Sequence, residues 1–203
     1  FCGVGNPFSL APIAAGNCVL DIGCGAGYDV FIASRLVGPE GKVFGVDLTA
    51  EMIDRARDNL NALQVKNVEI LQVKSEQLPF EKNYFDAVIS NGVINLSPSK
   101  SRLFAEIFRV LKPGGRLAIS DVVATAVLPD EVMDDPKLHA SCVSGAALID
   151  DLQAMLEAAN FSDVRITPRD ESREFIRDWV PGSGVEDYVI SAHIEAVKPA
   201  SGD

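Results

Sequence analysis

The stretch Val19-Leu20-Asp21-Ile22-Gly23-Cys24-Gly25-Ala26-Gly27 decides the fold of this 203-residue chain. Its apolar beginning predicts a short buried strand over 18–22, and apolar residues then recur at helical spacing over 28–37. Glycines lack β-carbons, so a ligand can approach the backbone of the intervening turn, and the following helix N-terminus favours negative or polar groups. The stretch therefore predicts a strand, a glycine-rich turn and a helix that together bind a small polar ligand.

The same alternation of strand and helix continues along the chain. One helix is predicted after Thr49, which can cap its N-terminus, and another begins at Ser97-Pro98. Repeated units of this length are typical of a mostly parallel sheet with helices on both faces. We therefore expect an α/β, Rossmann-like, doubly wound fold. Its further core strands are predicted at 42–47, 68–73, 85–90 and 116–123.

The C-terminal part departs from this alternation. A helix predicted over 148–159 is followed by two strands over 163–167 and 187–197, with no long helix between them. Parallel strands usually need a helical crossover, so we expect an antiparallel C-terminal edge strand. The segment 124–147 contains prolines, acidic residues and small residues, and is predicted to cross the carboxyl edge of the sheet as part of a lid.

The length of the chain fits a single domain, 1–203. Within it we expect four parts with different tasks. They are an N-terminal cover of substrate and cofactor (1–16), a cofactor-binding core (17–123), a lid or substrate segment (124–147) and a C-terminal helix with edge strands (148–203).

Composition and charge restrict the partners. Lys and Arg number 18 and Asp and Glu 29, giving a formal net charge of −11, which disfavours nucleic acid. No apolar stretch approaches the roughly 20 residues that span a bilayer, and no secretion signal is recognised. The four cysteines form no CxxC pair, which disfavours a zinc site or a disulfide framework. We expect a soluble cytoplasmic protein without a metal that acts on a small molecule; the sequence does not specify its oligomeric state.

The spacing of the glycines argues against a nicotinamide dinucleotide. In GxGxxG, the sixth residue is Tyr28 when counted from Gly23 and Val30 when counted from Gly25, so the third glycine is missing. Asp47 ends the second predicted strand, where a carboxylate can accept the hydroxyls of a ribose. The residues thus favour a nucleoside ligand without naming it.

Four motifs in order resemble those of class I S-adenosylmethionine-dependent methyltransferases: Asp21 to Gly27, Asp47, Ser75-Glu76-x-Leu78-Pro79-Phe80 and Leu111-Lys112-Pro113-Gly114-Gly115. The resemblance implies that S-adenosylmethionine binds and S-adenosylhomocysteine is released. It further implies roles for eleven positions. The turn with Asp21, Gly23, Cys24, Gly25 and Gly27 would lie against the methionine part of the cofactor, and Asp47 would hold the ribose. The adenine would be surrounded by Leu48, Met52, Ser75 and Glu76. Asn91 would position the amino end of the cofactor or the substrate.

Three further segments, 1–7, 90–97 and 140–146, resemble the arsenite methyltransferase family, and the likeness extends from Phe1 to about Phe161. In that family, thiolates from separate segments hold trivalent arsenic, and Cys142 matches a family cysteine. Soft thiolate ligands suit such a thiophilic centre. Val4 stands where an N-terminal family cysteine is expected, while Cys2 lies two residues earlier, and no cysteine follows Cys142. The resemblance therefore implies Cys142 and Cys2 as catalytic thiols, with glutathione or another small thiol as co-ligand or reductant.

Three other functions remain open at this point. A methyltransferase of a small organic molecule, such as a quinone-type ring or a metabolite, would keep the cofactor and change the acceptor. A domain that binds a nucleoside without catalysis would bind the cofactor without methyl transfer. A nicotinamide-dependent oxidoreductase is disfavoured by the missing glycine.

Overall fold

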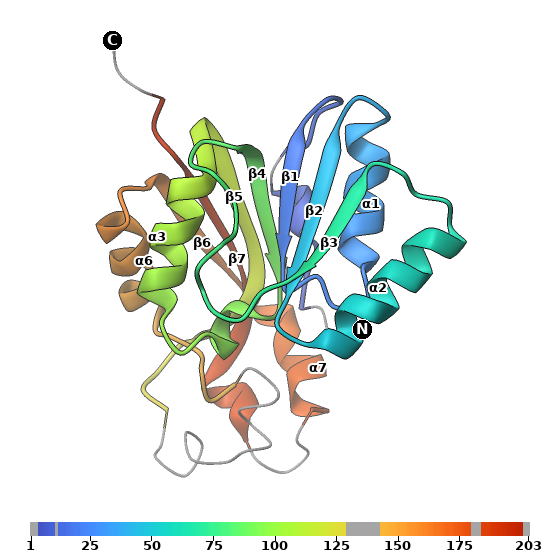
Figure 1. The fold of residues 1–203 in the computed structure, drawn as a ribbon. Coiled ribbons are helices and arrows are strands. Elements are labelled where there is room, and N and C mark those ends of the chain that lie inside the picture. The colour runs from blue at the N-terminus through green and yellow to red at the C-terminus, as the bar shows by residue number, and fades with distance from the viewer. Residues whose placement is uncertain (1–3, 11, 129–142, 180–183, 201–203) are drawn as a thin grey trace.

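The computed structural model describes residues 4–10, 12–128, 143–179 and 184–200 (Figure 1). In the first half of the chain, strands and helices alternate as predicted. A short 3-10 helix, η1 (Pro7–Ser9), precedes β1, and another, η2 (Ile94–Leu96), follows β4. The main elements are β1 (Cys18–Ile22), α1 (Tyr28–Val37), β2 (Lys42–Asp47), α2 (Ala50–Ala62), β3 (Val68–Gln72) and β4 (Phe85–Asn91).

The second half differs from the prediction at two strand ends. The fifth strand begins at Leu111 rather than at 116, because Leu111 already pairs with Phe85 of β4. The last strand begins at Val189 rather than at 187, because the preceding residues form a 3-10 turn. The elements are α3 (Lys100–Val110), β5 (Leu111–Ala124), α6 (Ile149–Ala158), β6 (Ser162–Arg169), η3 (Asp170–Ser172), α7 (Arg173–Arg177), η4 (Val185–Asp187) and β7 (Val189–Val197).

The strands form one seven-stranded sheet in the order β3-β2-β1-β4-β5-β7-β6 (Figure 1). Neighbouring strands from β3 to β5 are parallel, whereas β7 is antiparallel to both β5 and β6. The predicted mostly parallel sheet with an antiparallel C-terminal edge is confirmed. The reversed strand β7 inserts between β5 and β6, so it lies one position inside the edge.

Two hydrophobic cores lie on opposite faces of this sheet. Val19 packs with apolar residues of α1 and α2, and the adjacent Leu20 packs with apolar residues of α3 and α6. Successive side chains of a strand point to opposite faces. The helices therefore cover both faces, as the doubly wound prediction requires, and the carboxyl ends of the parallel strands remain available for a site.

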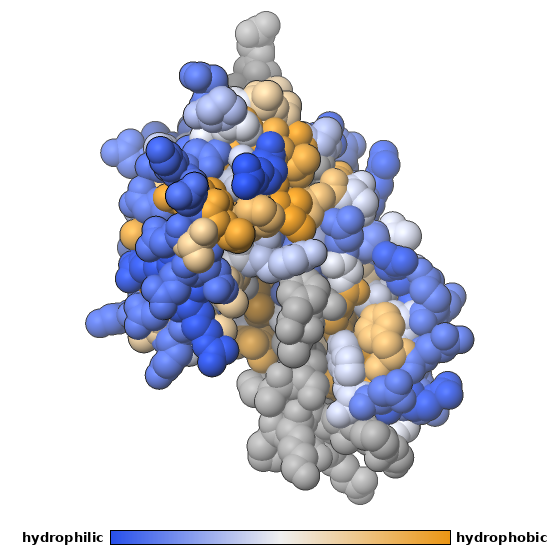
Figure 2. All heavy atoms as spheres, turned by 90° about the vertical axis from the view of Figure 1, so that its right-hand side faces the viewer, coloured by the Kyte–Doolittle hydropathy of each residue, from blue (hydrophilic) through white to orange (hydrophobic). Residues whose placement is uncertain are grey.

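The predicted lid over 124–147 is described only at its two ends, because 129–142 lie outside the described residues. There, the backbone N–H of Ala124 donates to Ala147 O at 2.9 Å. On the face shown in Figure 2, hydrophilic residues predominate and hydrophobic residues gather in separate patches. No helix in the described ranges is long and apolar enough to cross a membrane.

Candidate functional site

The carboxyl ends of β1, β2 and β4 border a cavity of about 400 Å³. From β1 the strand order leads to β2 on one side and to β4 on the other, and such a switch point is where α/β sheets bind ligands. The lining combines the glycine turn, polar side chains and apolar walls. It consists of Ile22, Gly23, Val46, Asp47, Leu48, Thr49, Met52, Val73, Lys74, Ser75, Glu76, Leu78, Val93, Leu96, Ser97, Pro98 and Leu103.

The cavity brings together six of the predicted cofactor residues from four separate segments. Three of these segments lie at or shortly after the carboxyl ends of β1, β2 and β3, and the fourth is the first turn of α2. The other five predicted cofactor residues, Asp21, Cys24, Gly25, Gly27 and Asn91, do not line the cavity. The six lining residues are Gly23, Asp47, Leu48, Met52, Ser75 and Glu76.

Backbone hydrogen bonds hold the glycine turn against β2. The N–H groups of Gly23 and Cys24 donate to Val46 O at 2.8 and 3.0 Å. Gly23 has a φ of 73°, and a β-carbon there would lie 2.2 Å from Val93 Cγ2. No side chain fits in that space, so the approach of the turn to Val93 requires glycine at this position.

Asp47 is held at the end of β2 by two backbone donors. The N–H of Gly25 donates to its Oδ2 at 3.0 Å, and the N–H of Thr49 donates to its Oδ1 at 2.9 Å. A carboxylate oxygen has more than one acceptor position, so both oxygens keep capacity for a further donor. The oriented carboxylate beside the cavity fits the two hydroxyls of a ribose, while the neighbouring Leu48 and Met52 offer apolar surface.

The opposite wall carries Ser75 and Glu76. The hydroxyl of Ser97 donates to Glu76 Oε1 at 3.0 Å. The pKa of Glu76 is lowered, chiefly by its own backbone N–H and then by the Ser97 hydroxyl, so the group is ionised at neutral pH. Polar groups thus edge a cavity whose remaining walls include Leu78 and Leu103, an arrangement suited to a planar ring with polar edges.

Two buried carboxylates lie beside the glycine turn. Asp21 is 2% exposed, and its Oδ2 has no hydrogen-bond partner among the described residues. Burial raises its pKa well above the ordinary value, and the negative charges of Asp29 and Asp47 raise it further. Burial likewise raises the pKa of Asp29, although a hydrogen bond from Asn91 opposes this. An unpartnered buried carboxylate favours a nearby cation or a proton, so this corner fits a positively charged ligand group.

Asn91 fastens the N-terminal segment to the end of β4. The N–H of Val4 donates to its Oδ1 at 3.0 Å, while its Nδ2 lies 3.1 Å from both Gly5 O and Asp29 Oδ2. The amide thus has partners within the protein. In this structure it holds Val4 and Gly5 at the end of β4 and does not line the cavity.

The two described cysteines are not available as thiolates. Burial raises the pKa of Cys18 to about 11 and raises that of Cys24 further still, with a contribution from the charges of Asp21 and Asp47. Cys24 contributes its backbone N–H to the turn. The predicted catalytic residues Cys2 and Cys142 lie outside the described residues.

A buried apolar cluster adjoins the carboxyl end of β5, and it joins segments that are far apart in the chain. Val4 belongs to it, two residues after Cys2 in the sequence, and so does the fully buried Val143, directly after Cys142. We call this set the valine cluster. Its buried members are Val4, Val122, Ala124, Leu128, Val143, Ile176, Val185 and Val189.

Sequence reasoning missed Asp121, which orders the segment between the cavity and the valine cluster. Its Oδ2 accepts the N–H of Ile94 at 2.8 Å, and its Oδ1 accepts Nδ2 of Asn95 at 3.1 Å. Burial raises its pKa to about 6. The signal in the sequence was a carboxylate within a predicted buried strand, between Ser120 and Val122.

The sequence was compared with known proteins. A family model described as "Methyltransferase domain" matches residues 13–160. An arsenite methyltransferase from Halobacterium salinarum is 50% identical over 201 residues, which are 99% of this chain and 51% of the relative. A demethylmenaquinone methyltransferase from Lactococcus lactis is 43% identical over 102 residues, 50% of this chain and 40% of the relative. The chain thus spans about half the length of the curated relatives it matches.

A solved structure is similar over the whole chain. It is the crystal structure of an arsenic (III) S-adenosylmethionine methyltransferase from Chlamydomonas reinhardtii, with a TM-score of 0.81 and 32% identity. The similarity covers 100% of this chain and 69% of that chain. The aligned part therefore includes the glycine turn and the C-terminal antiparallel strands.

Proposed function

The chain belongs to the methyltransferase-domain family, and from this premise we propose that it transfers a methyl group from S-adenosylmethionine to trivalent arsenic, as arsenite or methylarsenite, held by thiolates. The observation that carries the proposal is the cavity at the switch point with Asp47 fixed at its edge. The same site supports methyl transfer with any small acceptor, and the arsenic acceptor rests on further features described below. We propose that residues 1–203 act as one domain in this reaction.

The residues of the cavity fit the parts of S-adenosylmethionine. In the proposal, Asp47 accepts the ribose hydroxyls through the acceptor positions that Gly25 and Thr49 leave free. Leu48 and Met52 contact the faces of the adenine, and Ser75 and Glu76 meet its edge. The bound cofactor supplies a methyl group on a positively charged sulfur.

The buried carboxylates give this end of the site a negative field. The charges of Asp29 and Asp47 add to the cost of ionising the buried Asp21, and a cation beside Asp21 relieves it. We propose that the sulfonium and ammonium groups of the cofactor are attracted to this field. Sulfur becomes neutral once the methyl group leaves, so the product loses one attractive charge, which favours its release.

The acceptor is assigned to the side of the valine cluster. Cys2 and Cys142 are close in sequence to Val4 and Val143, which share that cluster, and thiolates are preferred ligands of thiophilic centres. Because the pKa values of Cys18 and Cys24 are raised, Cys2 and Cys142 remain as the candidate thiols. We propose that glutathione or another small thiol supplies the third ligand of arsenic and the reducing equivalents.

Methyl transfer needs positioning rather than a proton donor. The arsenic lone pair forms the bond to the methyl carbon, while the electron pair of the breaking carbon–sulfur bond stays on sulfur. Arsenic is thereby oxidised from the trivalent to the pentavalent state, and two equivalents of the small thiol reduce it back as they form a disulfide. Reacting atoms held about 3–3.5 Å apart in line account for most of the acceleration. The apolar side chains of the valine cluster exclude water from the acceptor side.

A small organic acceptor is the second candidate. The Lactococcus lactis relative, named as a demethylmenaquinone methyltransferase, aligns with 50% of this chain and supports it. Under this alternative, thiols are unnecessary, so Cys142→Ser retains methyl transfer.

The test measures methyl transfer from labelled S-adenosylmethionine to arsenite and to methylarsenite, with glutathione present. We expect methylated arsenicals from wild type, loss of product in Cys142→Ser, and a reduced rate in Cys2→Ser. Cys18→Ser is the control, because that residue lies at the start of β1, away from the cavity. If the cofactor binds and no arsenical is methylated, arsenic is not the acceptor. Methylation of a quinone-type ring would then identify the second candidate. Cofactor binding without any methyl transfer would identify a nucleoside-binding domain.

A further inference from the structure

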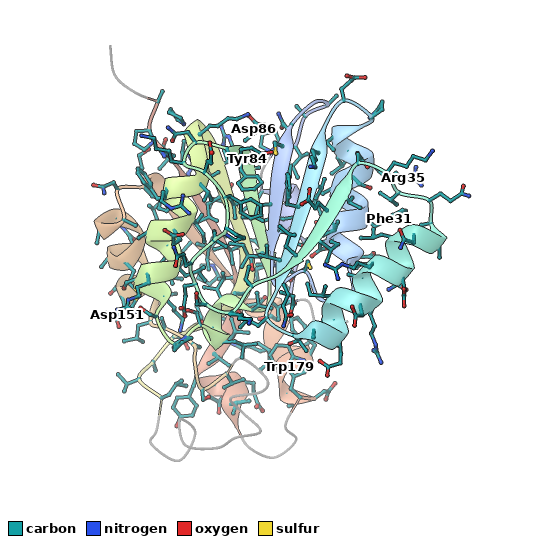
Figure 3. All side chains as sticks on the ribbon, in the orientation of Figure 1. Phe31, Arg35, Tyr84, Asp86, Asp151 and Trp179 are labelled. Atoms are coloured by element: carbon teal, nitrogen blue, oxygen red, sulfur yellow. The ribbon has the colours of Figure 1, made fainter. Side chains whose placement is uncertain are left out.

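A second cavity, of about 340 Å³, lies where β6, η3 and α7 meet the N-terminal segment. It shares no lining residue with the cofactor cavity. Trp179, beside α7, lies at the carboxyl end of the parallel strands, opposite to Asp86 at the start of β4 (Figure 3). The residues that matter here are Val4, Gly5, Arg169, Glu171, Ser172 and Phe175.

The cavity presents a positive and a negative charge side by side. Nε and Nη2 of Arg169 donate to Glu171 Oε1 at 2.8 and 2.6 Å. Nη1 of Arg169 lies 3.2 Å from His193 Nε2, and since a guanidinium only donates, that nitrogen accepts and the imidazole is neutral. His193 therefore orients the guanidinium without adding a second positive charge.

The ion pair is open to exchange with a ligand. The side chains of Arg169 and Glu171 are 38% and 65% exposed. Exposed pairs of this kind contribute little to stability, because water solvates both partners well. A ligand can give Arg169 a negative group in place of Glu171 and give Glu171 a positive group in place of Arg169. Each charge then keeps an opposite partner, and the ligand gains further contacts in the cavity.

Such a ligand is a zwitterion. An α-carboxylate pairs with Arg169 while an α-ammonium pairs with Glu171, whereas a simple anion or cation meets a like charge. The Ser172 oxygen accepts the N–H of Ser191 at 2.8 Å, so its hydroxyl hydrogen is directed elsewhere and can reach a carboxylate. The half-exposed ring of Phe175, 5.6 Å from the Trp179 ring, offers an apolar wall for a side-chain methylene.

The cavity adjoins the acceptor side of the proposed site. Val4 lines it and also belongs to the valine cluster together with Val143. The N–H of Val4 bonds to Asn91, and Val93, two residues later, lines the cofactor cavity. Val4 thus connects this cavity with the valine cluster, and Asn91 connects it with the end of β4 that leads to Val93.

We propose that this cavity binds the amino-acid headgroup of the small thiol that completes the coordination of arsenic. The inference rests on the proposed function, since it assigns a site to the external thiol of that reaction. The chemical class is an α-amino acid thiol such as cysteine, or a peptide thiol with the same headgroup.

The first experiment compares L-cysteine with 2-mercaptoethanol, which has no headgroup, as the thiol in arsenite methylation. Arg169→Gln is expected to raise the half-saturating concentration of L-cysteine about 10- to 100-fold, the usual loss for a charged hydrogen-bonded contact. The half-saturating concentration of 2-mercaptoethanol is expected to stay unchanged. Arg177→Gln is the matched control, because Arg177, at the end of α7, pairs with Glu186 of η4 at 3.4 Å and lines neither cavity. An equal rise for both thiols would overturn the proposal.

The second experiment measures binding without turnover, using calorimetry with S-methyl-L-cysteine. Binding to wild type, weakened in both Arg169→Gln and Glu171→Gln, is the expected result. If propionate binds as well as S-methyl-L-cysteine and Glu171→Gln strengthens both, the cavity is a plain anion site and the zwitterion assignment is wrong. If wild type methylates no arsenical with any thiol but shows this binding pattern, the proposed acceptor is wrong and the assignment of the headgroup site stands.

Discussion

The cofactor cavity is bordered mainly by turns that directly follow strands, whereas the valine cluster and the second cavity combine segments from both ends of the chain. Gly23 and Asp47 lie one residue after β1 and at the last position of β2, so local sequence places them at the sheet edge. Val4, Val143 and Val185 meet only because the chain folds back over the sheet. Under the proposed function, cofactor recognition and acceptor recognition depend on separate parts of the fold and should respond separately to substitution.

The largest effect is expected at the glycine turn. In Gly23→Ala, the new β-carbon would lie 2.2 Å from Val93 Cγ2 at a residue whose φ is 73°. We expect a loss of about 3 kcal/mol or more in the free energy of unfolding, because a packed core does not absorb such a displacement. Cofactor binding should be lost as well. Urea denaturation and calorimetry measure the two effects.

Gly25→Ala is the matched control for that change. Its φ is 51°, but a β-carbon there meets nothing within 4 Å. We expect only the cost of a left-handed residue, about 1–2 kcal/mol. Equal losses in the two variants would mean that the contact with Val93 has no special importance.

A pH-dependent effect is expected at Asp121, between the two regions. Burial raises its pKa from 3.8 to about 6, so the folded protein retains a proton that the unfolded chain releases between about pH 4 and 6. The stability from this group is thus present below pH 4 and is lost as the pH rises through 6. Between pH 4 and 7, wild type should lose up to about 3 kcal/mol relative to Asp121→Asn. Urea denaturation across this range measures the difference.

The exposed Asp54 on α2 is the control, since its side chain is 77% exposed. Asp54→Asn should follow the wild-type pH profile throughout. If Asp121→Asn also runs parallel to wild type, the carboxyl group of Asp121 does not carry the raised pKa.

The smallest effects test the separation of the two regions directly. Asp47→Ala should weaken binding of S-adenosylmethionine by about 1–3 kcal/mol, because ribose hydroxyls lose a charged acceptor. Val4→Ala should cost about 1 kcal/mol of stability and raise the KM of the acceptor, because it opens the valine cluster. Calorimetry with the cofactor and steady-state kinetics with the acceptor measure these effects.

The decisive measurement is the effect of each substitution on the ligand of the other region. Asp47→Ala should leave the binding of S-methyl-L-cysteine unchanged, and Val4→Ala should leave the cofactor affinity within about twofold of wild type. If either substitution impairs both ligands to the same degree, the two regions form one cooperative site and the comparison fails.

Most of the fold followed from periodicity in the sequence. The central strands β1, β2 and β4 lie within one residue of their predicted bounds, because buried parallel strands are short apolar runs bounded by turns. The start of β5 was missed, because the pairing of Leu111 with Phe85 depends on a neighbouring strand. The position of β7 inside the sheet also depended on pairing rather than on its own sequence.

Some of the predicted site residues lie where the chain itself sets the geometry. Asp47 ends β2 and Glu76 follows β3, and both line the cavity; their roles toward a cofactor remain a prediction. Asn91 was expected at the cofactor or substrate, and the structure gives its amide partners in Val4, Gly5 and Asp29. These partners come from segments distant in sequence, so no local sequence pattern predicts them.

The sequence by itself determined the strand, glycine turn and helix at 18–37, the place of Asp47 at the end of its strand and the family of the chain. Local steric rules and hydrophobic periodicity act over a few residues, and they suffice for these features. Only the tertiary structure decided which carboxylates share the buried corner with Asp21, and that Arg169, Glu171 and the N-terminal segment enclose a second cavity. Burial and the approach of charges from distant segments arise when the chain packs against itself, so they are properties of the fold as a whole.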